Sequence, residues 1–266
     1  MSNKHLDKEF LLGGSIEKAL SGDYELSPVK VLQEAWKNTL RYFISFFPAI
    51  MALLLAQLAL FLFALKLQLG DPFVLFEALQ GKGDLTEAML NAVWIANFSS
   101  EVLSAPLYAG VSLMAMSHAA GLPSKPRHLM KGLPFAVAVT IATMVASSVQ
   151  GMANLIFPLL SLYLTMALGM GTLLICEKRV PPLQALMLSF RATYKKIIPL
   201  TAIYMFLLIM FALSFTVFGL GLIIVLPFFF NVKGVIYRNM FGVSLKITTK
   251  IEGDDDNDND HQVFNA

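Results

Sequence analysis

The stretch FISFFPAIMALLLAQLALFLFAL, residues 43–65, decides the fold of this protein. It contains no charged side chain. An α-helix needs about 20 consecutive apolar residues to cross the hydrocarbon core of a bilayer, and this stretch meets that requirement. Pro48 lies in its opening turns, where the missing N–H of a proline does least damage to a helix. Residues 43–65 therefore predict a membrane-spanning helix.

The composition of the whole chain agrees with a membrane protein. Hydrophobic residues make up 56% of the sequence and charged residues only 14%, and the mean hydropathy is +0.66. This is too apolar for a fold that must be covered by water. The net charge of +2 creates no broad basic field, so we expect no nucleic-acid partner. Cys176 is the only cysteine, which excludes an internal disulfide and a multi-cysteine metal site.

Five further apolar windows extend this prediction to an all-α, polytopic membrane helix bundle of six spanning helices in three hairpins. The span with residues 100–118 is diluted by Glu101 and several serines, and it continues a helix that begins near Thr86. Clusters of turn residues divide the two longest apolar intervals, at 150–158 and at 218–221. The six predicted spans are residues 43–65, 100–118, 134–153, 157–176, 197–218 and 220–238.

The basic residues predict the orientation of the helices, because short loops rich in Lys and Arg stay on the cytoplasmic side. With both termini inside, only Lys66 and Lys82 among the basic residues lie outside. The outer loop at 70–87 carries Asp71 and Glu77, which agrees with that choice. We therefore expect a multi-pass protein of a bacterial inner (plasma) membrane with both termini in the cytoplasm.

Two basic amphipathic segments precede spans and predict helices at the cytoplasmic interface, at residues 28–41 and 182–196. They align without a gap, so that Pro28 matches Pro182 and Trp36 matches Phe190. The match indicates an internal duplication of one unit, an interfacial helix followed by a hairpin. The alternative is that any two basic amphipathic helices look alike.

The two ends of the chain are polar. Residues 1–27 predict a cytoplasmic N-terminal segment, residues 28–242 the membrane domain, and residues 243–266 an acidic, disordered cytoplasmic tail. The tail ends in EGDDDNDNDHQVFNA. Its aspartates suggest a cation-binding role as an alternative, but the run lacks the glycine and the closing glutamate of a calcium loop.

Few residues could carry chemistry. No soluble-enzyme motif is present, so we expect no catalytic residue, no cofactor and no metal. Ionisable and polar groups inside a membrane are functional candidates, which selects Glu101, Asn231 and Lys233. The alternatives are that Glu101 lies at the outer interface and that Lys233 reaches the cytoplasmic headgroups. On the predicted topology Glu101 and Lys233 lie near opposite membrane faces, so no direct ion pair is expected.

Three segments together resemble a known family. SIEKALSGDYELSPVKVLQEAWKNT at 15–39, ICEKRVPPLQALMLSFRATYKK at 175–196 and GVIYRNMFG at 234–242 are similar to YciC-like bacterial inner-membrane proteins. The resemblance implies a six-helix inner-membrane protein of unassigned activity, and it carries over no functional residue. The acidic tail and the long polar N-terminus are where this chain departs from that pattern.

The sequence leaves three function classes to consider. The first is a small transporter or channel-like protein in which bent helices surround a polar path. The second is a non-transporting scaffold or envelope-organisation partner, which binds lipid or protein through the basic interfacial helices with Trp36 and Phe190 as anchors. The expected partners are the lipid bilayer and either another membrane protein or a second copy of the chain. A membrane enzyme is the third class, and it lacks any cluster of acid, base and nucleophile.

Overall fold

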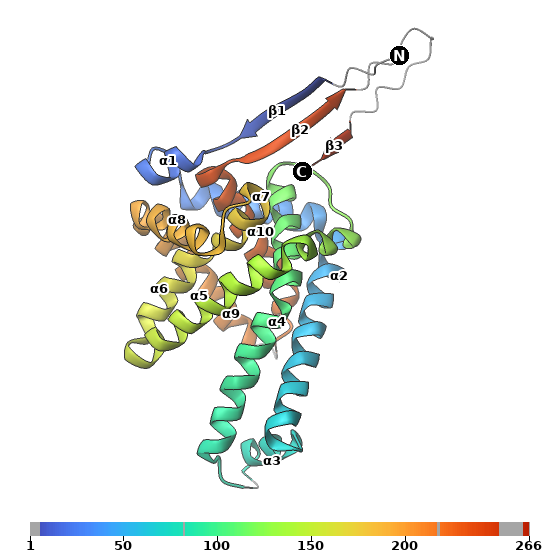
Figure 1. The fold of residues 1–266 in the computed structure, drawn as a ribbon, viewed down its shortest axis with the longest axis vertical. Coiled ribbons are helices and arrows are strands. Elements are labelled where there is room, and N and C mark those ends of the chain that lie inside the picture. The colour runs from blue at the N-terminus through green and yellow to red at the C-terminus, as the bar shows by residue number, and fades with distance from the viewer. Residues whose placement is uncertain (1–5, 82, 217–218, 250–262, 266) are drawn as a thin grey trace.

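The computed structural model describes residues 6–81, 83–216, 219–249 and 263–265. Six helical segments of this part are long and apolar enough to cross a membrane, so the predicted all-α membrane bundle is confirmed. Figure 1 shows the arrangement of the elements. Their bounds are β1 Leu6–Leu12, α1 Ile16–Ser21, α2 Pro28–Leu69, α3 Phe73–Leu79, α4 Glu87–Ala119, η1 Pro126–Phe135 (a 3-10 helix), α5 Ala136–Ile156, α6 Pro158–Leu168, α7 Gly171–Lys178, α8 Pro182–Lys195, α9 Ile197–Thr216, α10 Leu222–Phe241, β2 Val243–Thr249 and β3 Val263–Asn265.

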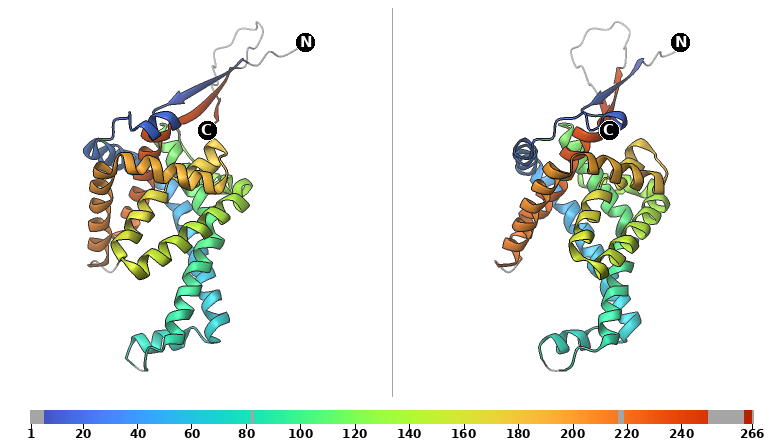
Figure 2. Two further views of the ribbon diagram at one scale, coloured as in Figure 1. Left: turned by 60° about the vertical axis from the view of Figure 1, so that its left-hand side comes forward. Right: turned by 90° about the vertical axis from the view of Figure 1, so that its left-hand side faces the viewer.

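The long helices form three hairpins, α2 with α4, α5 with α6, and α9 with α10. The hairpin of α2 and α4, with α3 at its turn, projects beyond the other two (Figures 1 and 2). The strands, α1 and α8 lie at the opposite end of the molecule, which we call the terminal end. The third hairpin turns between Thr216 and Leu222, as the FGLG sequence predicted.

The first predicted interfacial helix and the first span are one continuous helix. α2 runs through 42 residues from Pro28 to Leu69. The predicted interfacial helix ends at residue 41 and the predicted span begins at residue 43, and no glycine or proline interrupts the helix at this boundary. Pro48 lies inside the helix. The second basic segment differs, because α8 ends at Lys195 before α9 begins at Ile197. The two segments thus start alike, at a proline, and continue differently.

The second hairpin departs from its prediction. The expected span 157–176 is not one helix, since α6 ends at Leu168 and α7 begins at Gly171. The break is bridged by Ser189 of α8, whose hydroxyl donates to the Ala167 carbonyl at 2.6 Å and accepts from the Met170 N–H at 3.2 Å. Where a helix is interrupted, such backbone groups lose their hydrogen-bond partners within the helix. The Ser189 hydroxyl bonds to both of them, so α8 stabilises the break.

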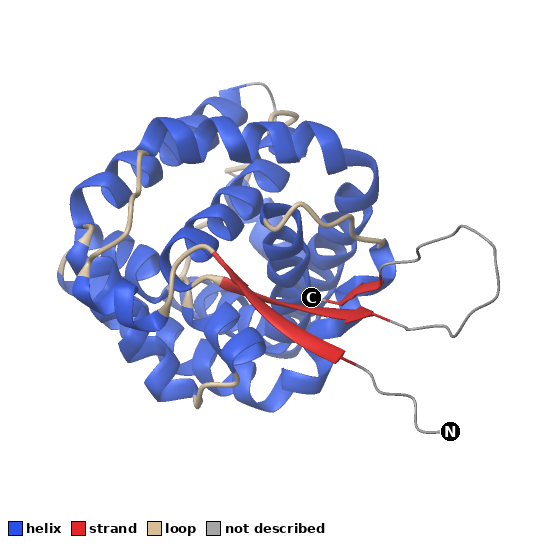
Figure 3. Ribbon diagram, turned by 90° about the horizontal axis from the view of Figure 1, so that it is seen from above, coloured by secondary structure: helices blue, strands red, loops and turns tan. Residues whose placement is uncertain are grey.

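The termini form a three-stranded antiparallel sheet in the order β1-β2-β3, which Figure 3 shows lying over one end of the bundle. Leu12 pairs with Val243 and Leu6 with Thr249. The predicted disordered tail 243–266 is therefore wrong for 243–249 and 263–265, and the predicted polar segment 1–27 contains β1 and α1. The acidic run of the tail lies outside the described residues.

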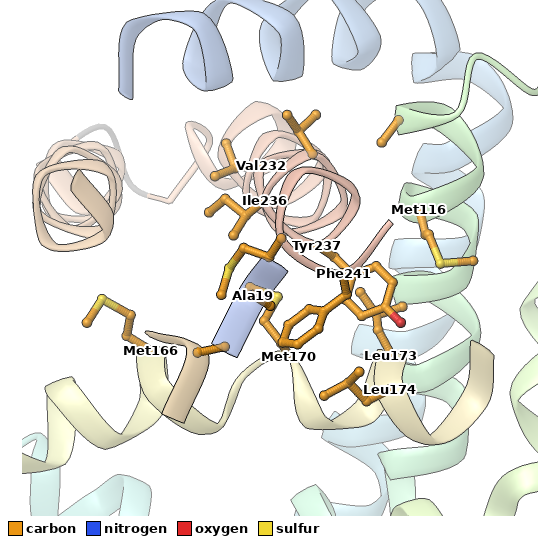
Figure 4. Close-up of a cluster of buried hydrophobic side chains, with 14 of the residues drawn as sticks. Ala19, Met116, Met166, Met170, Leu173, Leu174, Val232, Ile236, Tyr237 and Phe241 are labelled. Atoms are coloured by element: carbon orange, nitrogen blue, oxygen red, sulfur yellow. The ribbon is translucent and has the colours of Figure 1, made fainter. Parts of the chain in front are cut away.

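The largest group of buried apolar side chains lies where α4, α7, α8 and α10 meet (Figure 4). Met170 and Leu173 on one side contact the face of α10 that carries Ile236 and Tyr237. The same helix approaches α4 closely, because a Cβ added at Gly234 would lie 2.5 Å from the Ala115 carbonyl oxygen. α10 is thus held centrally in the bundle, with its side chains turned toward several neighbours.

Candidate intramembrane binding site

A cavity of about 510 Å³ lies between α4, α5, the broken segment α6–α7 and α10, with α2 and α8 at its edges. Its wall is mixed, with small apolar side chains among hydroxyl, amide and charged groups. The polar residues that line it are Gln57, Asn97, Ser100, Glu101, Tyr108, Thr143, Ser147, Gln150, Thr165, Thr172 and Lys233. Two of the three candidates from the sequence, Glu101 and Lys233, therefore line one cavity.

Lys233 is buried at 2% exposure, so its predicted alternative, an ammonium that reaches the membrane surface, is wrong. Its ammonium donates to the Tyr108 hydroxyl at 3.2 Å and to the Ser112 hydroxyl at 3.4 Å. It also lies 4.4 Å from the centre of the Tyr108 ring, a cation–π distance. No carboxylate of the described residues lies within ion-pair distance of it. The cation is held by neutral groups, with the cavity beside it.

Glu101 lies near the middle of the 33-residue α4 and faces the same cavity. Ser147 of α5 lies beside its carboxyl group. Tyr108, which contacts Lys233, follows Glu101 on the same face of α4. The separation of these two positions is two helical turns, or about 10 Å along the helix axis. The prediction placed the two charges near opposite membrane faces. The structure brings both to one cavity, with Glu101 two turns of α4 away from the Tyr108 that contacts Lys233.

Asn231 is fully buried, on a face of α10 that does not line the cavity. Its amide donates to the Thr39 hydroxyl at 3.1 Å and to the Pro227 carbonyl at 3.0 Å, and its oxygen lies 3.1 Å from Nδ1 of His118. Nε2 of His118 lies 2.7 Å from the Ser124 hydroxyl. Asn231 thus belongs to a polar network that joins α2, α4 and α10.

The role of His118 was missed by the sequence analysis. Its ring stacks on Tyr42 at 4.4 Å and meets Phe46 edge-on at 4.8 Å. Because the Asn231 amide group already donates twice, its oxygen must accept from Nδ1, and Nε2 then accepts from Ser124. The spacing of Tyr42, Phe46 and Thr39 on one face of α2 was the available signal, but nothing in the sequence pairs that face with His118.

The break between α6 and α7 borders the cavity, because Gly169 and Thr172 both line it. Irregular backbone at membrane depth is tolerated where it is buried in protein or lines a cavity. Broken helices of this kind mark binding sites in many membrane transporters. The break, Glu101 and Lys233 therefore border one cavity from three different spans.

A second polar hollow, of about 730 Å³, lies at the terminal end between α1, α2, α8 and α10. Four of its seven charged residues form ion pairs, Lys30 with Glu25 and Arg238 with Glu34, and the Lys196 ammonium lies over the Tyr24 ring. A hydrogen bond from Lys30 and its charge lower the pKa of the Glu25 carboxyl, and burial raises the pKa of Tyr24. The Arg238–Glu34 contact connects α10 with α2 at this end of the molecule.

Among residues 6–81, 83–216, 219–249 and 263–265, no three side chains of His, Cys, Asp or Glu are grouped so as to hold a metal ion. No family model, curated protein or solved structure matches this chain. The resemblance to YciC-like proteins therefore stays a prediction. The fold and the candidate spans define the class of protein: it is a multi-pass membrane protein built as an all-α bundle.

Proposed function

We propose that this protein is a small, non-enzymatic membrane transporter whose substrate site is the cavity that Glu101 and Lys233 line. The observation that carries the proposal is that Glu101 and the buried Lys233 line one cavity of about 510 Å³. That volume falls within the range of small-molecule sites, about 300–1,000 Å³. Charged groups inside a membrane are costly, so an acid and a base retained at one cavity support a role in binding.

The broken span supports transport over a purely structural role. α6 and α7 meet at the cavity wall, and the break is fixed from outside the hairpin by Ser189. A continuous helix would satisfy the same backbone groups without help from α8. The interruption instead places the backbone of Gly169 and the hydroxyl of Thr172 beside the cavity.

We further propose that the terminal end faces the cytoplasm of a bacterium, at the inner membrane, and that the chain is YciC-like. Support for the orientation comes from the basic residues of α1, of the first turns of α2, of α7 and of α8, which gather at that end, following the rule for short loops. Cysteines placed at Lys66 and Lys37, in a Cys176→Ala background, test this sidedness. An impermeant thiol reagent added to whole cells should label position 66 and spare position 37; the reverse pattern would invert the proposed topology.

Uptake of labelled solutes into proteoliposomes tests the transport proposal. The panel consists of organic acids, amines, amino acids, short peptides and sugar phosphates. We expect at least one class to enter with the unmodified protein, and both Lys233→Met and Glu101→Gln to abolish that uptake. Lys37→Met removes an exposed lysine and should leave uptake unchanged. Absence of uptake for every class, or normal uptake by both cavity variants, overturns the proposal.

A further inference from the structure

Lys233 has no carboxylate partner in the part of the chain that the structure describes, and this carries an inference that rests on the proposed function. We infer that the cavity binds a monovalent organic anion, a carboxylate with an apolar body, and that Lys233 binds its carboxylate group. Three features support this: the contacts of the ammonium group, its depth in the bundle and the residues that line the cavity.

The protein surrounds the Lys233 ammonium with neutral groups only. Two of its three N–H donors have hydroxyl acceptors, Tyr108 at 3.2 Å and Ser112 at 3.4 Å. The Tyr108 ring, with its centre 4.4 Å away, adds a cation–π contact but no full negative charge. The counter-charge is therefore left to a ligand in the cavity that Lys233 lines.

The contact with Tyr108 places the ammonium group near the middle of the membrane span. Gln57 of α2 donates to the Ser104 hydroxyl of α4 at 3.2 Å, which aligns these two antiparallel helices. Tyr108 lies one turn beyond Ser104, so it is level with Leu53, near the centre of the apolar stretch 43–65. A charged side chain is costly at this depth, and a bound anion would reduce that cost.

The lining of the cavity favours an anion with a single charge. Lys233 is the only basic residue among the described residues that line it, and Glu101 is the only acidic one. A phosphate monoester or a dicarboxylate would bring a second negative charge that no cation of the lining neutralises. The lining also contains no arginine, the side chain best suited to bidentate contacts with phosphate. A monocarboxylate matches the single ammonium group.

The size and the apolar part of the cavity suit the body of an organic acid. Its volume of about 510 Å³ is far larger than an inorganic anion such as chloride, and it lies within the range of small-molecule sites. Large apolar side chains contribute to the lining from three helices, and these are Leu58, Phe61, Leu168 and Leu186. An organic anion with an apolar body could contact these side chains, whereas a bare inorganic anion would leave most of the cavity empty.

A second hydrogen-bond donor for the carboxylate comes from α7. Cys176 lies within electrostatic range of the Lys233 ammonium. Thr172 precedes Cys176 by one turn on the same face of α7, and it lines the cavity. A carboxylate has two oxygen atoms, so one can accept from the ammonium group and the other from the Thr172 hydroxyl.

Calorimetric titration of the purified protein in detergent tests the inference with ligands that differ in their polar group. Benzoate and hexanoate are the carboxylates, benzamide and hexanamide are their neutral analogues, benzylamine is a cation, and phenyl phosphate carries a second negative charge. We expect at least one carboxylate to bind at least about tenfold more tightly than its amide, benzylamine and phenyl phosphate, because only the carboxylate forms a charge-assisted contact without excess charge. Titration into empty micelles is subtracted, since apolar ligands enter detergent.

Three variants assign the preference to Lys233. Lys233→Met should weaken the carboxylate by about tenfold and leave its amide unchanged. Glu101→Gln should bind the carboxylate as tightly as the unmodified protein or more tightly, because it removes an acidic group from the cavity. Lys37→Met removes an exposed lysine and should change nothing. A melting curve checks the fold of each sample; where Lys233→Met does not fold, the comparison of carboxylate with amide in the unmodified protein decides.

Four outcomes of these titrations overturn the inference. They are that neither carboxylate binds more tightly than its amide, that phenyl phosphate binds as tightly as the carboxylate, that chloride at equal concentration displaces the carboxylate, or that folded Lys233→Met keeps the full carboxylate affinity.

Nanodiscs distinguish a free organic acid from a lipid headgroup. Carboxylate binding should be the same in phosphatidylcholine and in phosphatidylglycerol. Its loss in phosphatidylglycerol would assign the cavity to an anionic lipid headgroup, and it would overturn the inference too. Uptake of another solute class that requires Lys233 and Glu101, without carboxylate binding, would preserve the proposed transport function while the anion inference fails. Carboxylate binding without uptake of any class would have the reverse meaning.

Discussion

Arg238 of α10 and Glu34 of α2 form a two-point ion pair across 204 residues of sequence, with N···O distances of 2.5 and 2.8 Å. The same guanidinium donates to the carbonyl of Ala119 at 2.6 Å, at the end of α4. One side chain therefore joins α10, α2 and α4 at the terminal end. The planar fork of an arginine allows this, whereas a lysine could make only point contacts.

The first prediction concerns this junction. Arg238→Met should lower the free energy of unfolding by about 1–2 kcal/mol, because hydrogen bonds to charged groups contribute more than neutral ones, while the partly exposed Glu34 regains water. Thermal unfolding in detergent measures the change. Lys30→Met is the control, since the side chains of Lys30 and Glu25 are 73% and 76% exposed. An ion pair as exposed as this one should not change stability measurably. Equal effects from both variants would contradict the importance of the junction.

A second prediction concerns the bridge at the broken span. Ser189→Ala leaves the Ala167 carbonyl and the Met170 N–H without their partner. Leaving buried polar groups unsatisfied in this way should cost about 2 kcal/mol. Its control is Ser148→Ala, since the Ser148 hydroxyl is exposed and bonds only within its own helix, to the Met144 carbonyl. Unfolding by added SDS, followed by tryptophan fluorescence, measures both. An unchanged midpoint for Ser189→Ala would show that the break does not depend on α8.

The third prediction concerns the close contact of α10 with α4. In Gly234→Ala the added carbon would lie 2.5 Å from the Ala115 carbonyl oxygen, so the helices must separate. Overpacking of this kind should destabilise the protein by about 1–3 kcal/mol. Gly151→Ala is the control, since nothing lies within 4 Å of its added carbon. That change should be neutral or stabilising, as alanine favours a helix over glycine. Melting temperatures of the two variants should therefore move in different directions or by clearly different amounts.

A fourth prediction concerns the tautomer of His118. Donation from Nδ1 to Asn231 and acceptance at Nε2 require the proton on Nδ1. A nitrogen-15 NMR spectrum of protein labelled at histidine should contain one ring with that less common tautomer, absent from His118→Gln. In Asn231→Leu the Nδ1 proton loses its acceptor, and the signal should move or broaden. A proton found on Nε2 in the unmodified protein would refute the hydrogen-bond assignment.

Most of the spans could be predicted from sequence because each is an apolar window of about the length that a bilayer requires. The start of α4 was predictable for a local reason too, since the Thr86 hydroxyl accepts from the Met89 N–H, as an N-cap should. These are properties of neighbouring residues. They need no knowledge of which hairpin lies beside which.

The break in the fourth span and the shared cavity could not be predicted in that way. The bridge across the break comes from Ser189, whose position depends on how α8 packs. Glu101 and Lys233 meet one cavity because α10 lies against α4 at Gly234, a tertiary contact. The strand at 243–249 did have a signal, the alternation of apolar and polar residues that is typical of a strand. The acidic run that follows this strand in the sequence led instead to the prediction of a disordered tail over residues 243–266.

The pairing of β1 with β2 has a consequence for how this molecule is made. A ribosome releases the β1 segment before α2 and its partner strand β2 only after α10. Until then β1 has no paired strand, and its unpaired backbone N–H and C=O groups can pair with strands of other chains. The sheet can close only on a chain whose three hairpins have all been produced. Its closure therefore distinguishes a chain that contains all three hairpins from one that stops before β2.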